Sequence, residues 1–481
     1  MSALFYLIMD INPAALTIAS AIDMLHAGEI SATSLAQACL ARIEQLNPRN
    51  HAFITVTPDL ALAQAAQADA LLSRKPSNLD QLLLLGIPLA LKDLFDLAGV
   101  CTTAGSMFFD GRIPTEDAES VLKLKLAGAT ILGKTNTHEI ALGVTGVNPH
   151  FGTVPNPWDG TRITGGSSSG SAAAVATGMC LAALGTDTGG SIRIPASLCG
   201  VVGLKPTYGR ISLRGVMPLS WNLDHVGFLT RSVQDAALLL QVLAGYDPHD
   251  PASADVAVDD YLVHLEEGVK GWRVALAVGE YVEASDPAVQ AALNDAVGVF
   301  KVLGAQVEKV DMDELANLAR ANVQMTQADA AALHRQRLAE HPDWFGEDVR
   351  QRLQTGATLA GSEYALARRE QAEGRRRFEM FFEKFDLLLL PTTLIPAPLI
   401  AGTEAIQAAR LLTRFTAPFN LVGLPALSIP CGFVDSLPLG LQMISCHWGE
   451  AKLLQAGHAY EAATSADRRS GLPKPPAAQT G

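Results

Sequence analysis

Gly185-Thr-Asp-Thr-Gly-Gly-Ser-Ile-Arg-Ile-Pro195 is the most informative stretch of the chain, because it places one hydroxyl, Ser191, directly after two glycines. The glycines leave the backbone bare, so the N–H groups of Thr188, Gly189, Gly190 and Ser191 can point at one spot. Acyl-transfer enzymes need a nucleophilic oxygen beside N–H donors that receive the charge developing on the attacked carbonyl. A Gly-Gly-Ser sequence alone is more often a turn, so the upstream sequence has to decide between the two interpretations.

Two further segments bear on that choice. Residues 165–174 read Gly-Gly-Ser-Ser-Ser-Gly-Ser-Ala-Ala-Ala, which is typical of a tight turn that leads into a helix. The apolar run that starts at Gly86 has the length of a strand and ends in Lys92. Apolar surroundings disfavour the charged form of a lysine and lower its pKa. For Lys92 taken alone, the alternative is a lysine at a strand end that reaches solvent.

Together, the three segments resemble the amidase signature family. The resemblance implies a Ser–cis-Ser–Lys triad in which Ser191 is the nucleophile, Ser167 the bridging serine and Lys92 the terminal base, with a cis peptide bond before Ser167. Ser167 precedes Ser191 by 24 residues, the spacing associated with the family. Thr164 and Ser169 depart from it, since proline and glycine are expected there. Further family-like blocks extend the resemblance over roughly residues 60–465, namely 133–136, 156–158, 200–207, 224–227 and 423–431.

The chemistry of these three residues follows from their side chains. Serine is a poor nucleophile at neutral pH and needs a base within hydrogen-bond reach. A neutral Lys92 can accept a proton from Ser167, which in turn takes one from Ser191. Because an unperturbed lysine has a pKa of about 10.4, burial must lower the pKa of Lys92 by roughly 2 to 3 pH units. We therefore expect Lys92 to be buried.

Supporting roles are predicted for three more side chains. Asp187 and Arg193 flank the Gly-Gly-Ser turn and are expected to fix its shape through hydrogen bonds, the alternative being an ordinary loop ion pair. Ser168, beside the bridging serine, is the third supporting residue. Replacement of Gly190 is expected to cost activity through backbone geometry alone.

Composition indicates a large enzyme without nucleic-acid or membrane partners. The chain has 481 residues and a formal net charge of −13 without a block of like charges, which argues against nucleic-acid binding. No apolar run reaches the roughly 18 residues of a membrane span. The apolar start at Ala3–Met9 lacks the features of a signal peptide, so we expect a cytoplasmic protein whose translation starts at Met1 or Met9. The predicted partner is a small-molecule amide substrate, and a homodimer is left open.

Cysteine and histidine usage points to chemistry without a cofactor. The six cysteines are scattered without a CxxC pair, which suggests neither a metal site nor a disulfide framework. None of the eleven histidines lies in the glycine- and serine-rich blocks. The sequence therefore predicts no metal and no organic cofactor.

Hydrophobic periodicity predicts an α/β fold, and the family resemblance implies a mixed central β-sheet sandwiched between helical layers. The predicted helices are 14–26, 31–46, 58–74, 116–127, 170–179, 232–245, 286–303, 313–340, 362–384 and 449–465. The predicted strands are 88–92, 129–132, 181–186, 272–277, 305–310, 386–390, 425–430 and 439–444.

Domain organisation depends on one Asp- and Pro-rich segment, Tyr246–Asp255, which reads as a linker. The family fold instead implies a surface loop within one amidase domain that spans residues 1–481. In that interpretation N-terminal helices (about 10–75) precede the signature core (about 80–245). Later strands and helices (about 265–465) complete the same sheet, and residues 466–481 are predicted to be disordered.

Two other segments match known functional motifs, but the sequence around each argues against that function. Gly128–Thr135 fits the nucleotide-binding pattern GxxxxGK[ST], but its strand-like residues 130–132 lie inside the supposed loop. Gly166–Gly170 fits G-x-S-x-G, which would make Ser168 the nucleophile of an α/β-hydrolase. That turn needs a strand directly before it, and the Pro-rich residues 155–164 disfavour one.

Within the family, the subgroup depends on the residue next to the nucleophile turn. The A subunit of tRNA-dependent amidotransferases shares the triad and generates ammonia from glutamine for a partner. In that subgroup glutamine is expected at the position of Ile194. Because Ile194 is aliphatic, the sequence favours a stand-alone amidase that hydrolyses a carboxylic amide through an acyl-serine intermediate. The alternative is the ammonia-generating component of such an amidotransferase.

Overall fold

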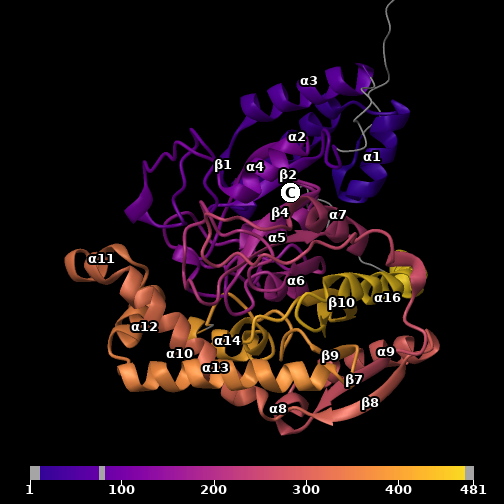
Figure 1. The fold of residues 1–481 in the computed structure, drawn as a ribbon. Helices are drawn as coiled ribbons and strands as arrows, with labels where there is room; N and C mark the ends of the chain where they lie inside the picture. Colours follow the sequence, from indigo (N-terminus) through magenta and orange to yellow (C-terminus); the bar gives the residue numbers. More distant parts are fainter. Residues whose placement is uncertain (1–10, 75–81, 403, 472–481) are drawn as a thin grey trace, which may run out of the picture.

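The computed structural model describes residues 11–74, 82–402 and 404–471, and a mixed sheet of eleven strands lies at the centre of this part (Figure 1). The strand order is β1-β3-β2-β4-β6-β5-β10-β11-β9-β7-β8. The strands are β1 (Phe53–Val56), β2 (Pro88–Lys92), β3 (Thr130–Thr135), β4 (Ala182–Asp187), β5 (Val202–Lys205), β6 (His225–Thr230), β7 (Arg273–Val278), β8 (Gln306–Asp311), β9 (Leu387–Pro391), β10 (Ala426–Val434) and β11 (Leu437–Ile444).

The helices around this sheet are α1 (Ile18–Ala27), α2 (Ala32–Asn50), α3 (Pro58–Arg74), α4 (Glu119–Leu126), α5 (Ser169–Ala176), α6 (Arg193–Cys199), α7 (Val233–Leu243), α8 (Glu280–Glu283), α9 (Pro287–Val302), α10 (Leu315–Leu333), α11 (Arg335–Glu340), α12 (Glu347–Ala357), α13 (Gly361–Phe382), α14 (Ala405–Leu412), α15 (Ala417–Leu421) and α16 (Glu450–Gly471).

Helices cover both faces of the sheet. Leu387 and Leu389 of β9 pack in one hydrophobic cluster with side chains of α7 and α16, whereas Leu388 and Leu390 pack in a second cluster with side chains of α10 and α13. Alternate residues of a strand point to opposite faces, so each face has its own helical layer. The predicted α/β class and mixed sheet between helical layers are confirmed. In Figure 1, α3 and α13 lie at opposite ends of the molecule.

The structure contradicts both competing motif interpretations. Residues Thr130–Thr135 form the buried strand β3, so the GxxxxGK[ST] match is not a phosphate-binding loop. Pro155 and Ile163 form only an isolated bridge rather than a strand before Ser168, as the α/β-hydrolase turn would require.

Strands from both sides of the 246–255 segment belong to one sheet, since β5 pairs with β10 in antiparallel register. This supports the single-domain prediction. Helix α16 continues to Gly471, beyond residue 466, where the predicted disordered tail begins. The predicted start region before Ile11 and the tail residues 472–481 lie outside the described residues.

Candidate active site

Two neighbouring parallel strands bring the predicted base to the Gly-Gly-Ser turn. Strands β2 and β4 pair in register from Leu89↔Ala182 to Leu91↔Leu184, so Lys92 and the residues after β4 share one edge of the sheet. The fully buried Lys92 donates through Nζ to Ser167 Oγ at 2.7 Å and to Thr186 Oγ1 at 2.8 Å. Lys92 and Ser167 are therefore brought together as the resemblance implied.

Burial lowers the pKa of Lys92 to about 7, although the negative charges of Asp187 and Asp224 act in the opposite direction. Transfer of a lysine out of water disfavours its charged form. Near neutral pH, a substantial fraction of Lys92 is thus uncharged and able to accept a proton. The lowered pKa of Lys92 lies in the range that we expect of a base at neutral pH.

Ser167 lies in the turn before α5, and its peptide bond with Gly166 is cis, as the resemblance implied. The Ser167 carbonyl accepts from Thr137 Oγ1 at 3.0 Å and from the His138 N–H at 3.1 Å. The Ser168 N–H donates to the Ser191 carbonyl at 3.2 Å, and this bond holds the serine turn against the Gly-Gly-Ser turn.

Asp187 shapes the turn that carries Ser191. Its carboxylate accepts from the N–H groups of Gly190 (2.8 Å) and Ile192 (3.1 Å) and pairs with Arg193 at 2.9 Å. The Gly190 N–H is thereby engaged by a side chain of the protein, so its predicted role as an oxyanion donor competes with this hydrogen bond and stays a prediction. The N–H groups of Thr188, Gly189 and Ser191 have no acceptor among the described residues, and their role as oxyanion donors stays a prediction.

The Asp187–Arg193 pair is more than an ordinary loop ion pair, because both side chains are fully buried. Arg193 also donates to Gln442 Oε1 and to Asn420 Oδ1, each at 2.6 Å. Burial would raise the pKa of Asp187, but the Arg193 guanidinium outweighs this effect and holds the pKa below its usual range. Sequence reasoning missed Asn420 and Gln442, since no local motif marks them.

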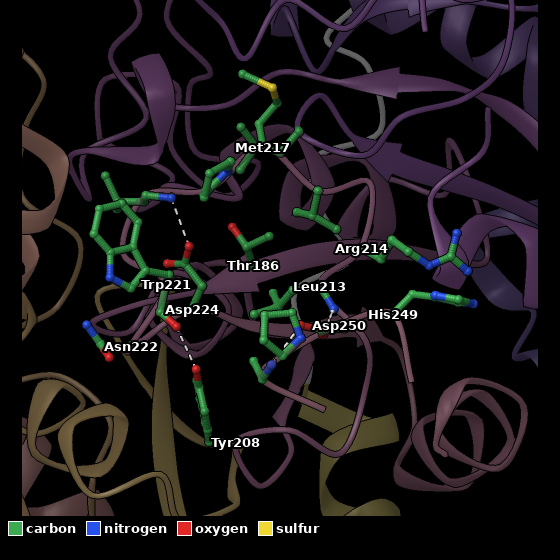
Figure 2. A pocket seen from close by; sticks show the side chains of 16 residues that line it. Thr186, Tyr208, Leu213, Arg214, Met217, Trp221, Asn222, Asp224, His249 and Asp250 are labelled. Carbon is green, nitrogen blue, oxygen red and sulfur yellow. Dashed lines mark hydrogen bonds between the residues drawn. The ribbon is translucent and has the colours of Figure 1, made fainter. Parts of the chain in front are cut away.

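A cavity of about 520 Å³ reaches Thr186, the residue before Asp187, and Figure 2 shows the side chains that line it. Apolar side chains including Met217 and Trp221 form much of its wall, and Thr186 and Asp224 add polar groups. Thr186 both lines the cavity and accepts from Lys92. The cavity is thus adjacent to the candidate base, and it is the place where we expect a substrate to approach.

Within residues 11–74, 82–402 and 404–471, no cluster of three or more His, Cys, Asp or Glu side chains is placed so that it could bind a metal ion. Within the same ranges, no helix has both the length and the hydropathy needed to cross a membrane.

The fold, together with the buried lysine and serine side chains, defines an amide-cleaving enzyme, and this chain belongs to the amidase family, whose model matches residues 34–454. It therefore acts on amide C–N bonds. The chain is 38% identical over 480 residues to the A subunit of the glutamyl-tRNA(Gln) amidotransferase from Syntrophus aciditrophicus, with 94% of this chain and 98% of that protein covered.

Solved structures agree with the family. The A subunit of the glutamyl-tRNA(Gln) amidotransferase from Thermotoga maritima superposes with a TM-score of 0.79 at 33% identity, over 94% of this chain and 95% of that one. A chain of an inhibitor-bound vestigial complex, which reveals the evolutionary origins of an s-triazine catabolic enzyme, gives a TM-score of 0.89 at 33% identity. That superposition covers 94% of this chain and 99% of the other.

These relatives overturn the prediction of a stand-alone amidase. Curated relatives that match over nearly their whole length at 38–40% identity are amidotransferase A subunits, which also contradicts the expectation of a small-molecule partner without nucleic acid. The prediction rested on Ile194, whose side chain is buried in an apolar cluster with Ile163 and Leu412. An aliphatic residue there satisfies local packing and does not decide the subgroup.

Proposed function

We propose that this chain is the A subunit of an amidotransferase that acts on glutamyl-tRNA(Gln), and that it releases ammonia from the side-chain amide of glutamine. The observation that carries the chemistry is the buried hydrogen bond of 2.7 Å from Lys92 Nζ to Ser167 Oγ. Similarity to A subunits over nearly the full chain supports the substrate and the assembly.

The proposed reaction proceeds through an acyl-enzyme on Ser191. Neutral Lys92 takes the proton of Ser167, which takes that of Ser191, and Ser191 Oγ attacks the amide carbon. The N–H groups of Thr188, Gly189 and Ser191 receive the negative charge on the carbonyl oxygen. The C–N bond then breaks as the proton returns through Ser167 to the nitrogen, and ammonia leaves.

The second half of the reaction regenerates the enzyme. Water gives a proton to the same relay and attacks the ester carbon, so the Ser191 Oγ–C bond breaks and glutamate leaves. In the proposed complex, a partner protein uses the ammonia to convert the glutamyl group on the tRNA. This chain requires no cofactor for the steps that its own residues perform.

The assembly is tested by purifying the tagged chain from the cells that encode it and identifying the proteins that co-purify. We expect partner proteins, together with glutamine-dependent formation of glutaminyl-tRNA by the purified complex. A Ser191→Ala chain should still co-purify with the partners but form no product with glutamine. Purification as a lone chain without glutaminase activity would contradict the proposed assembly and substrate.

A further inference from the structure

One buried carboxylate links the cavity wall to the proposed oxyanion donors. Asp224 Oδ1 accepts from Thr188 Oγ1 at 2.6 Å, and Oδ2 accepts from the N–H groups of Leu219 (2.8 Å) and Ser220 (3.0 Å). Both oxygens are therefore used, one toward the turn that carries Ser191 and one toward the wall of the cavity. Asp224 itself lines that cavity (Figure 2).

The Thr188 side chain is one of three that hold this turn, beside Thr416 Oγ1, which donates to the Gly189 carbonyl at 2.6 Å, and Asp187, which accepts from the Gly190 N–H. Gly189 and Gly190 have no side chains with which to fix their own amides, and Gly190 adopts a φ of 133°. Thr188 is held from two sides, because its carbonyl also accepts from Asn322 Nδ2 at 3.1 Å. A shift of the Thr188 side chain would therefore act first on the N–H groups of Thr188 and Gly189, since the Gly190 N–H is held by Asp187.

The cavity wall that Asp224 contacts is also hydrogen-bonded to helices α10 and α13. Ser220 Oγ donates to Asp329 Oδ2 of α10 at 2.6 Å, and Tyr364 of α13 donates to the same carboxylate at 2.9 Å. The wall at residues 219–222 is thus held by α10 and α13, and α10 also reaches the Gly-Gly-Ser turn through Asn322. Asp224 is the side chain that bonds to both regions directly.

We propose that Asp224 is a positioning residue that couples the cavity wall at residues 219–222 to the oxyanion donors beside Ser191. The inference rests on the proposed role of Ser191. A group bound in the cavity contacts the wall, and the Asp224 carboxylate transmits the position of that wall to Thr188. Thr188 and Asp224 should then act as one unit in the transition state rather than as two independent contacts.

The test is a double-mutant cycle on the intact complex with Thr188→Val, Asp224→Asn and the double variant, using glutamine as substrate. Each single change should lower kcat by roughly 10- to 100-fold with a smaller change in KM, because oxyanion donors act mainly in the transition state. The double variant should be no slower than the slower single variant. Thr188→Ser, which keeps the hydroxyl, should restore kcat to near the wild-type value.

Asp235→Asn is the matched control for loss of a buried carboxylate. Asp235 lies on α7, is buried and accepts from the Ala19 N–H at 3.1 Å, away from the candidate site. The control substitution is expected to lower the thermal midpoint without changing kcat of the folded enzyme. If Asp224→Asn does not fold, the comparison of Thr188→Val with Thr188→Ser decides the outcome.

Three results would each overturn the inference. They are losses of kcat that are fully additive in the double variant, a change confined to KM, and equal rates for Thr188→Val and Thr188→Ser. Ser191→Ala separates this failure from that of the proposed function. An inactive Ser191→Ala variant combined with an additive cycle would overturn only the role of Asp224, whereas wild-type turnover by Ser191→Ala would overturn the proposed function itself.

Discussion

Lys92 is the residue on which the proposed chemistry depends most. Its pKa is lowered to about 7, mainly by burial, and only the neutral amine can act as the base. Activity should therefore rise with pH through this value, since protonation of Lys92 removes the base below it. Measured from about pH 5.5 to 9, kcat/KM should show an ionisation near pH 7 on its acidic side.

The charge of Asp224 should influence that ionisation. Negative charge on Asp224 raises the pKa of Lys92, and burial raises the pKa of Asp224 itself to about 6. Asp224→Asn removes the charge, so the acidic limb of its residual kcat/KM profile should move to lower pH. Asp187 still raises the pKa of Lys92 in this variant. A shift of the limb to higher pH would contradict the assigned electrostatics.

Replacement of Lys92 by arginine tests the need for a neutral base. Arginine keeps the positive charge but cannot be deprotonated in this pH range, so kcat should fall by roughly 10²- to 10⁴-fold. Lys123→Arg is the matched control, because Lys123 is a partly buried lysine on α4 that donates to the carbonyls of Leu243 and Ala244. Near-wild-type kcat for Lys92→Arg would show that Lys92 is not the base.

Among the elements, the turn between β4 and α6 leaves no room for a side chain at Gly190. A Cβ there would collide with Thr416 Oγ1 and lie 2.6 Å from Ile194 Cδ1, and the φ of 133° is unfavourable for other residues. Gly190→Ala should therefore lower kcat at least as far as loss of one oxyanion donor, roughly 10²-fold.

Gly298→Ala in α9 is the control for this change, because a Cβ there would meet nothing within 4 Å. Alanine favours a helix, so this variant should be more stable than the wild type by roughly 0.5–1 kcal/mol, with unchanged kcat. The two variants are compared by thermal unfolding and by ammonia release. Equal activity of Gly190→Ala and Gly298→Ala would contradict a requirement for this backbone geometry.

Local patterns predicted some elements well and missed others for physical reasons. The apolar runs at β2 and β4 stand out in the sequence and place Lys92 and Ser191 correctly. Strands β1, β5 and β6 were not predicted, because β1 and β5 have only four residues and β6 begins at His225 and contains Gly227. Helix α6 was missed because it has seven residues and contains Pro195. Tertiary packing stabilises these elements where local propensity is weak.

Local sequence patterns likewise identified only part of the candidate active site. Lys92, Ser167 and Ser191 lie in contiguous motifs, so their residue types and spacing identify them as candidates. Asn420 on α15 and Gln442 on β11 reach Arg193 from distant parts of the chain, 227 and 249 residues away, and only the tertiary fold brings them there. Likewise, the sequence of the turn does not reveal that Asp187 occupies the Gly190 N–H.

For the whole molecule, the continuous sheet predicts that the fold survives a cut of the chain shortly after the linker-like segment Tyr246–Asp255. A protease site inserted between the exposed residues Asp259 and Asp260 would separate β1–β6 from β7–β11. Because β5 pairs with β10 and α7 packs on α16, the two fragments should co-elute after cleavage and separate only in denaturant. Separate elution under native conditions would contradict a single domain.

The proposed subgroup also rests on the whole molecule, because it follows from similarity along the entire chain rather than from one position. Ile194 alone favoured a stand-alone amidase, whereas the curated relative from Syntrophus aciditrophicus, similar over 94% of the chain, is an amidotransferase A subunit. A single buried side chain can change with its packing neighbours, so its identity is a poor guide to the assembly in which the protein works.

Acylation of Ser191, on which the proposed function depends, can be observed by mass spectrometry of the complex quenched in acid during turnover of glutamine. We predict a γ-glutamyl adduct on the peptide that contains Ser191, and loss of both adduct and ammonia release in Ser191→Ala. An adduct on Ser168, or undiminished ammonia release by Ser191→Ala, would show that Ser191 is not the nucleophile.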